Sequence, residues 1–432
     1  MDNNGKVVIF IEENLNVGGV ETYTYKSLKQ LSARGVKGIL LLGEHGQLAD
    51  AFSDIVNDPN ILVWRKELQI DKLKEMTENC DDAQITLVAF FMNSYILADA
   101  FKEKCDWCRV ETFFFVNHYT EWINYPETAF SMPIRPIVKK RFENIFSKMN
   151  ENDNIRYFTT RHINVMQDSY GYHINKNREE LIVPSATIMK PFDPKRVEQI
   201  YDREEFKILS PLRFDFPHKG FIIGLIKTYG ELKENYPNLQ FTIVGSGPDE
   251  YQVKKAIQEL PEFARKDIAL NGTCSPEKLN DYYLDASLNI GVAGCFSGGA
   301  KLGVLSLPAR NYCMDCETYG FPPDSIQLSV STDPGLPIKD FIIRVLNMSK
   351  EEYIQKSKDC YEALRVDPNI VLIENIHNKS DITLNSKERK FIERVFRIIK
   401  KKMRHQERKK ALKRNGLLNS IKRYFDKRIK NG

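Results

Sequence analysis

The sequence predicts an α/β protein of two Rossmann-like lobes with an interlobe cleft, followed by a basic amphipathic helical tail. Short apolar runs alternate with amphipathic helical stretches, as in parallel sheets wrapped by helices. The alternation stops in a loop-rich stretch near 185–205 and then starts again, and 432 residues exceed one ordinary core. We therefore expect a first lobe over 1–188, a second over 189–378 and the tail over 386–432.

The first lobe opens with the run KVVIFIEE, which is typical of a strand buried on both faces. The stretch NVGGVETYTYKSLKQLSARG then turns through Gly18 and Gly19 into an amphipathic helix that ends near Gly35. Further strands are expected at QITLVAFFM, VETFFFVNH, RYFTT and GILLLGE. Ligands gather at the carboxyl ends of parallel strands, and Gly18, Gly19 and His118 all lie at such ends. His118 could act on a substrate, or it could be a satisfied histidine in an aromatic wall.

The second lobe has predicted strands at FKILSPLRF, LQFTIVGSG, DIALNG and SLNIGVA, with helices at about 220–235, 249–260 and 276–286. Arg213 and Lys219 flank a proline-containing loop after the first of these strands. A guanidinium fork and a point charge together suit a diphosphate, although both could also be solvated surface cations.

The stretch SGGAKLG indicates a glycine turn at the start of a helix. Such a turn leaves backbone N–H groups and the positive end of the helix dipole free for a phosphate. Ser297 would be the N-cap, and Gly298, Gly299 and Ala300 would supply the backbone, with Lys301 one turn further. The alternative is an ordinary surface turn.

At these residues the sequence resembles the GT-B glycosyltransferases, and within them glycosyltransferase family 4. The resemblance runs over roughly residues 5–310 and is carried by NVGGVETY, SPLRFDFPHKG, YPNLQFTIVGSGP and NGTCSPEKLNDYYLDASLNIGVA. It implies two Rossmann-like lobes that bind a nucleotide-sugar between them and transfer the sugar with retention of configuration. No metal and no cofactor are expected, because positive groups would stabilise the leaving diphosphate.

The resemblance also implies roles for individual residues. In the family pattern the arginine and lysine hold the diphosphate, the glycine loops lie against the donor, and a histidine often lies beside the transferred sugar. Carried over to this chain, the catalytic residues are His118, Arg213 and Lys219, and the donor-binding residues are Gly18, Gly19, Gly245, Gly247, Ser297, Gly298, Gly299 and Ala300.

The chain departs from the family pattern at one place. The family usually carries two glutamates eight residues apart around this turn, and here the matching positions are Cys295 and Gly303. Asp215, Asp315 or Glu317 could supply a carboxylate instead. The departure motivates an alternative reading of the chain as a catalytically inactive binding or assembly subunit.

The cysteines do not predict a metal site. The pairs CDWC and CMDC have ligand spacing, but about two hundred residues separate them, whereas a zinc ribbon needs roughly 15–20. We therefore interpret both spacings as coincidence and expect no metal.

The tail carries most of the positive charge. Residues 387–430 hold 19 Lys/Arg and 4 Asp/Glu, a net +15 against +5 for the whole chain, which leaves −10 on the rest. Apolar residues recur with helical spacing at Phe391, Val395, Ile398 and Ile399. A basic amphipathic helix favours an anionic membrane surface, while packing of one face on the body is the alternative. Nucleic acid is not the expected partner, because no groove-reading or base-stacking motif accompanies the charge.

Together these features predict a glycosyltransferase that extends a growing surface polysaccharide or a lipid-linked oligosaccharide. The first apolar run is only five residues long, and the longest apolar stretch is interrupted by Asn93, Ser94 and Asp99. We therefore expect a cytoplasmic protein, peripheral on the inner face of the cell membrane, whose partners are a nucleotide-sugar donor, the acceptor and anionic lipid.

Overall fold

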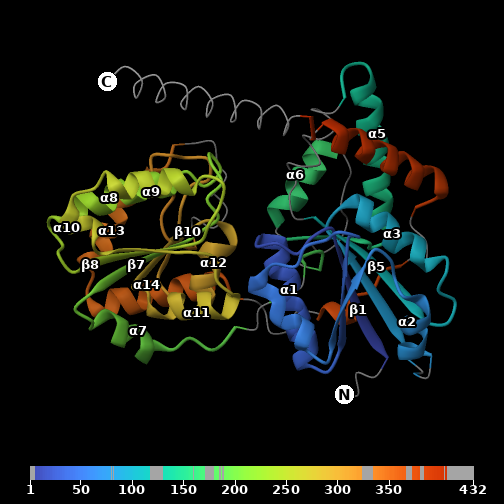
Figure 1. Cartoon of the computed structure of the whole chain (residues 1–432), viewed down its shortest axis with the longest axis horizontal. Helices are drawn as coiled ribbons and strands as arrows, with labels where there is room; N and C mark the ends of the chain where they lie inside the picture. Colours follow the sequence, from blue (N-terminus) through green and yellow to red (C-terminus); the bar gives the residue numbers. More distant parts are fainter. Residues whose placement is uncertain are drawn as a thin grey trace, which may run out of the picture.

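The chain forms two parallel α/β sheets, one in each half, which confirms the predicted fold class (Figure 1). The computed structural model describes residues 5–78, 80, 82–116, 130–158, 160–170, 180–183, 186, 189–323, 334–365, 372–379, 384–402 and 404–405. None of the helices in these ranges has the length and apolar character needed to cross a membrane.

The first lobe is built on a six-stranded sheet of order β3-β2-β1-β4-β5-β6, in which every neighbouring pair is parallel. This is the strand order of a doubly wound Rossmann sheet. Its elements are β1 (Lys6–Glu12), α1 (Gly19–Ala33), β2 (Lys37–Leu42), η1 (Asp50–Asn57), β3 (Ile61–Arg65), α2 (Ile70–Thr77), β4 (Gln84–Ala89), α3 (Met92–Lys102), β5 (Arg109–Val116), α5 (Ile134–Glu151), β6 (Ile155–Tyr157) and α6 (Thr160–Tyr170).

The aromatic run in β5 shows how the apolar strands fill both faces of this sheet. Successive side chains of a strand point to opposite faces. Phe113 and Phe115 accordingly join the core cluster that contains the buried side chains of α1, and Phe114 joins the cluster that contains those of α5. The second half of this strand, residues 113–116, is therefore apolar at every position, as expected for a sheet covered on both sides.

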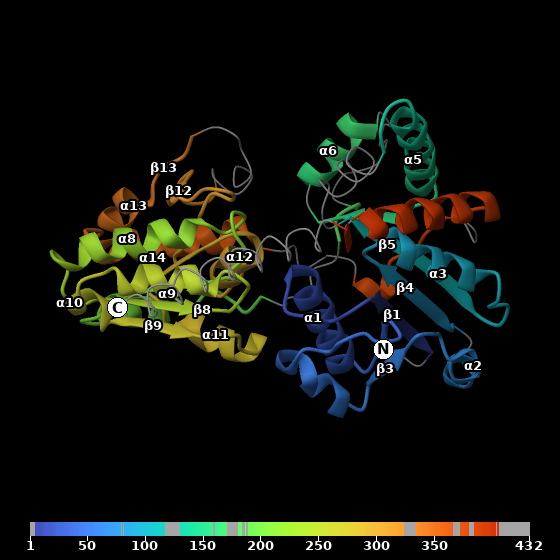
Figure 2. The same ribbon diagram turned by 45° about the horizontal axis from the view of Figure 1, so that its top comes forward.

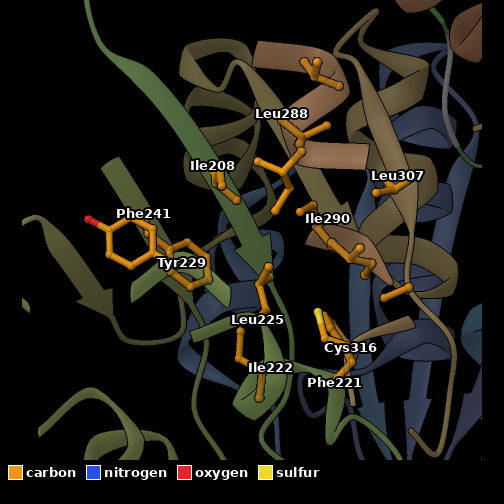
Figure 3. Close-up of a cluster of buried hydrophobic side chains, with 14 of the residues drawn as sticks. Ile208, Phe221, Ile222, Leu225, Tyr229, Phe241, Leu288, Ile290, Leu307 and Cys316 are labelled. Carbon is orange, nitrogen blue, oxygen red and sulfur yellow. The ribbon is translucent and has the colours of Figure 1, made fainter. Parts of the chain in front are cut away.

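The second lobe is built on a five-stranded sheet of order β11-β10-β7-β8-β9, again a Rossmann-like order with parallel neighbours. Figure 3 shows its core, where Ile208, Leu288 and Ile290 of the central strands pack with Leu225 of a covering helix. Its elements are α7 (Pro194–Tyr201), β7 (Phe206–Pro211), α8 (Phe221–Lys233), β8 (Leu239–Val244), α9 (Glu250–Gln258), α10 (Glu262–Arg265), β9 (Ile268–Asn271), α11 (Pro276–Asp285), β10 (Leu288–Gly291), α12 (Ala293–Lys301), β11 (Ser306–Pro308), β12 (Glu317–Thr318), β13 (Leu336–Pro337), α13 (Ile338–Leu346) and α14 (Lys350–Ala363).

After α14 the chain returns to the first lobe, which differs from the expected boundary at residue 378. In η2 (Ile373–Asn375), Glu374 is buried and pairs with Arg34, the C-cap of α1, at 2.8 Å. A helix over 386–402 then crosses α3 and α5, as both Figure 1 and Figure 2 show. The first lobe thus contains a segment from each end of the sequence.

The first part of the predicted tail is part of this lobe. Ile392, Val395 and Ile399 are at most 5% exposed and belong to a first-lobe core cluster. For 386–402 the alternative of packing on the body is therefore the correct one, and its apolar face is not available to a membrane. The rest of the predicted tail, residues 406–432, lies outside the described residues.

Candidate functional site

The predicted glycine pair of the first lobe lies at the carboxyl end of β1, at the start of α1. Gly18 is the N-cap and Gly19 the first helical residue. A Cβ atom on Gly18 would lie 2.3 Å from Oε2 of Glu21, whereas Gly19 faces open space. The first N–H groups of α1 and the positive end of its dipole therefore emerge at this edge of the sheet.

A buried carboxyl group at the end of β1 is hydrogen-bonded to α1. Glu12 ends β1, is 3% exposed, and its Oε1 accepts a hydrogen bond from Thr24 Oγ1 at 3.0 Å. Burial raises the pKa of Glu12 well above its usual range, and the nearby Glu21 charge raises it further. Glu12 is therefore protonated over a wider pH range than an exposed glutamate.

The Arg213–Lys219 loop follows β7 and leads into α8, as predicted. Arg213 is 56% exposed at its side chain, and its Nη2 donates to Asp215 Oδ2 at 2.7 Å. Lys219 is half-buried just before the N-cap Gly220, and its ammonium group has no hydrogen bond or ion pair with a described residue. Arg213 is thus oriented by its neighbour, while Lys219 is available to an anion.

The glycines of the loop after β8 support the arginine loop. Gly245 has a φ of +143°, and a Cβ atom there would lie 1.8 Å from Leu212 O. A Cβ atom on Gly247 would lie 2.3 Å from Phe214 O. The two loops run against each other, with Phe214 N donating to Ser246 O at 3.0 Å. Glycine is required at these positions because the backbone that carries Arg213 passes so close.

The predicted helix start at Ser297 is wrong. Helix α12 begins at Ala293, and its N-cap is Val292, five residues before the predicted N-cap Ser297. A positive φ of 47° at Ala293 makes the sharp turn that the glycines were expected to make. Ser297, Gly298, Gly299 and Ala300 therefore lie within the helix, and the last two are buried. Their amides are not the free donors of a helix start, because only the first four N–H groups of a helix lack an intrahelical partner.

Close packing explains the two glycines instead. A Cβ atom on Gly298 would lie 2.9 Å from the Tyr283 hydroxyl, and one on Gly299 would lie 2.6 Å from Asn289 Nδ2. The same two side chains hold the start of the helix, because the Tyr283 hydroxyl donates to Cys295 O at 2.8 Å and Asn289 Nδ2 donates to it at 3.2 Å. Asn289 was not among the predicted site residues, although a polar residue within an apolar strand could have indicated it.

Helix α1 and helix α11 meet between the lobes. The Tyr25 hydroxyl lies 2.7 Å from Glu277 Oε1 of the second lobe and 3.1 Å from Asp54 Oδ2 of its own lobe. Burial raises the pKa of Tyr25, and both carboxylates raise it further. The tyrosine therefore remains a hydrogen-bond donor to these two acceptors at any physiological pH.

Lysines of both lobes act electrostatically on Cys295, in the first turn of α12. Burial raises the pKa of the Cys295 thiol, and the charges of Lys219 and Lys26 act against that shift. Burial lowers the pKa of Lys26, while the charges of Glu277 and Cys295 oppose the shift. Lys26 belongs to α1 and Lys219 precedes α8, so one end of α12 is approached by lysines of both lobes.

A third lysine adds to this cation group. Burial lowers the pKa of Lys301, and repulsion from Lys26 lowers it further. Neither Lys26 nor Lys301 has a hydrogen bond or ion pair with a residue that the structure describes. Lys301 was noted from the sequence, but Lys26 was not, because helical spacing alone does not indicate which lysine of α1 faces the other lobe.

The positions matching the family's glutamates carry no negative charge. Cys295 lies in the first turn of α12, and Gly303, with a φ of +72°, follows that helix and packs beside Phe192. Of the carboxylates proposed as substitutes, Asp215 pairs with Arg213, and Glu317 pairs with Arg310.

Two further predictions concern His118 and the absence of a metal. His118 lies outside the described residues, two positions after the end of β5. Among the residues described, one group could hold a metal ion: Cys313, Asp315 and Glu317, whose ligand atoms lie within 4.8 Å of one another. The Glu317 carboxylate of this group also accepts from Gly335 N at 3.0 Å. The expected absence of a metal stays a prediction.

Comparisons with known proteins give distant structural likenesses. No family model and no curated protein matches the chain. A solved glycosyltransferase from Rickettsia africae is 15% identical with a TM-score of 0.48, and the match covers 92% of this chain and 99% of that one. HepE of Anabaena, solved with UDP and glucose, is 11% identical with a TM-score of 0.48 over 83% of this chain and 94% of that one.

A putative UDP-N-acetylglucosamine 2-epimerase from Listeria monocytogenes is similar to the same degree, with 12% identity and a TM-score of 0.47 over 83% of this chain and 94% of that one. Likenesses at this distance carry no argument about the chemistry of this chain. The two Rossmann-like lobes are established by the strand orders of its own sheets.

Proposed function

We propose that the chain is a glycosyltransferase that binds a nucleotide-sugar between its lobes and transfers the sugar. The observation that carries the proposal is that the charges of Lys26 and Lys219, one from each lobe, both act on Cys295 in the first turn of α12. The exposed residues Ala293 and Gly294 open that helix, and the first N–H groups of a helix lack an intrahelical acceptor. Lysine ammonium groups and free helix amides at one point suit a diphosphate.

The proposed mechanism is electrostatic. Negative charge grows on the diphosphate as its bond to the sugar breaks, and cations fixed beside it lower the barrier. Lys219 and Arg213 would hold the phosphates, with Asp215 keeping the arginine fork oriented. Since these cations can neutralise the leaving group, we propose transfer without a metal ion, and with retention as the family resemblance implies.

Donor binding can be tested by thermal shift with a panel of nucleoside diphosphates and nucleotide-sugars. We expect at least one donor to raise the melting temperature, and Lys219→Ala to remove that rise. Lys227→Ala is the matched control, because Lys227 is an exposed lysine on α8. Absence of both a shift and donor hydrolysis across the panel would contradict the proposal.

We further propose that the acceptor is a growing surface polysaccharide or a lipid-linked oligosaccharide, reached at the inner face of the cell membrane. Support comes from the start of α5, where Met132, Ile134 and Ile137 are 51–69% exposed. Lys139 and Lys140 are exposed on the same helix. Apolar side chains beside lysines suit an anionic lipid surface.

Membrane binding can be tested by co-sedimentation with vesicles. We expect binding to vesicles that contain anionic lipid and much weaker binding to neutral ones. Replacing Ile134 and Ile137 by serine should weaken it, whereas Val56→Ser, at a site 57% exposed on η1, should not. Equal binding by all variants, or none by the wild type, would reject this surface.

The second candidate function is a catalytically inactive subunit that keeps the fold for binding or assembly. The uncharged Cys295 and Gly303 at the positions of the family's glutamates favour it. A complementation assay separates the two candidates. Loss of function on replacing Arg213 and Lys219, with folding preserved, supports the enzyme, and retention of function supports the inactive subunit.

A further inference from the structure

The loop between α3 and β5 carries two cysteines that the proposed function does not use. Cys105 and Cys108 are both half-buried, and their sulfur atoms lie 3.5 Å apart. The eight cysteines of the chain are all described, and only this pair has a sulfur–sulfur contact. A disulfide bond is about 2.0 Å long, so a movement of about 1.5 Å would close it.

The surroundings hold this loop in place. Trp107, between the two cysteines, donates from Nε1 to Thr77 Oγ1 at 3.0 Å and meets Phe101 edge to face. Arg109, where β5 begins, donates its backbone N–H to Ala83 O at 3.2 Å. Because the middle and the end of the loop are anchored to the first lobe, the two thiols are kept in contact rather than brought together by chance.

The two thiols are also chemically distinct. The hydrogen bond from Cys108 lowers the pKa of Cys105, and sharing that proton raises the pKa of Cys108. Attack on a disulfide requires a thiolate, so Cys105 is the nucleophile of the pair. The large separation of the two cysteine pairs in the sequence argues against a shared metal site. The one group of three or more potential metal ligands among the described residues does not include Cys105 or Cys108.

We propose that Cys105 and Cys108 form a redox-active dithiol that closes to a disulfide on reaction with a small-molecule disulfide. The Cys105 thiolate attacks one sulfur of that disulfide and expels the first small thiolate. The Cys108 thiolate then attacks Cys105 Sγ and expels the second. Two protein thiols thereby lose two electrons and two protons, the small disulfide gains the electrons, and the protons end on the two small thiols.

The experiment equilibrates the full chain with oxidised and reduced glutathione, quenches it with an alkylating agent, and maps the peptides by mass spectrometry. The expected result is one disulfide, joining Cys105 to Cys108, with the loss of two hydrogen atoms. Cys108→Ser should stop at the glutathione adduct of Cys105, and Cys105→Ser should form no internal disulfide. Melting temperatures of both variants show whether they are folded.

Cys313 and Cys316 provide the internal control. They have the same spacing and are both buried, but they share no sulfur–sulfur contact, so they should remain reduced. The proposal is overturned if the wild type stays fully reduced or stops at glutathione adducts. It is equally overturned if Cys313 and Cys316 close as readily, or if the pair retains one zinc ion.

The outcome is separable from the proposed function. The loop precedes β5 and therefore lies at the amino end of that strand, whereas Gly18 and Gly19 follow the carboxyl end of β1. In a parallel sheet these are opposite edges. Closing the disulfide should accordingly leave the donor-induced thermal shift unchanged, and failure of either proposal does not imply failure of the other.

Discussion

At the scale of single residues, the glycines of this chain have two different reasons to be present. Gly245 is required by a positive φ and by the passage of Leu212 O, and both causes are local to two adjoining loops. Gly299 lies within a regular helix, where glycine is unfavourable on its own. Glycine is needed at this position because Asn289 of the neighbouring strand lies so close. Gly299 is therefore explained by packing and does not indicate a ligand.

This distinction predicts opposite effects for two substitutions in one helix. In Gly299→Ala the new methyl group would lie 2.6 Å from Asn289 Nδ2, so we expect a loss of about 1–3 kcal/mol in the free energy of unfolding. Gly294→Ala has nothing within 4 Å and should be neutral or stabilising by up to about 1 kcal/mol. Denaturant unfolding measures both. Equal losses would show that the packing argument is wrong.

Glu12 predicts an unusual pH dependence of stability. Its folded pKa is raised by burial and by Glu21, so above the usual glutamate range the folded state binds more protons than the unfolded state. Its contribution to stability is therefore full at low pH and is lost as the pH rises toward the folded pKa. Glu12→Gln keeps an oxygen acceptor for Thr24 Oγ1 and should make the protein more stable at neutral pH.

The effect of Glu12 is measured as the unfolding midpoint between pH 5 and 8. The midpoint of the wild type should fall as the pH rises, and Glu12→Gln should reduce that fall. Glu75→Gln, at an exposed position of α2, is the control and should keep the wild-type slope. A parallel shift of the whole curve in Glu12→Gln, with its slope intact, would contradict the assignment.

At the scale of elements, the sequence predicts the strands far better than the site. The runs KVVIFIEE, QITLVAFFM and VETFFFVNH became β1, β4 and β5 because a strand buried on both faces carries consecutive apolar residues. The start of α12 could not be predicted, since a positive φ at Ala293 and contacts from Tyr283 decide it. Neither cause is visible in a local pattern.

The helix over 386–402 is a second such case. Its apolar spacing predicts an amphipathic helix, but spacing does not distinguish a membrane from a protein surface as the partner. A buried ion pair fixes this helix on the protein surface. Arg389 Nη2 lies 2.9 Å from Asp99 Oδ2, and Asp99 is fully buried on α3. These two residues are 290 positions apart in the sequence.

This ion pair gives the element its prediction. Arg389→Ala would leave the Asp99 carboxylate buried without its cation, so we expect a loss of about 3–5 kcal/mol in the free energy of unfolding. Arg394→Ala, at an exposed position of the same helix, should change stability by less than about 0.5 kcal/mol. Chemical denaturation compares the two variants, and similar values for both would exclude a structural role for the pair.

At the scale of the whole molecule, one pair of groups attracts the two lobes to each other and another pair repels them. The Tyr25 hydroxyl and Glu277 attract across the interface at 2.7 Å. Lys26 and Lys301, which come from facing lobes, repel each other and are both partly buried. Burying two like charges near each other is unfavourable, so an anion placed between these lysines would stabilise a closer approach of the lobes.

The same balance predicts how the molecule responds to a donor. A nucleoside diphosphate should reduce the radius of gyration, measured by small-angle X-ray scattering, because its charge replaces the repulsion between Lys26 and Lys301 with two attractions. Lys26→Gln removes that repulsion, so it should be more compact than the wild type before the ligand is added and should change less afterwards. Lys227→Gln on the exposed face of α8 should behave as the wild type does. If the radius of Lys26→Gln equals that of the wild type and the ligand contracts both equally, the lysines do not control the approach of the lobes, and the attraction through Tyr25 and Glu277 is then sufficient to account for it.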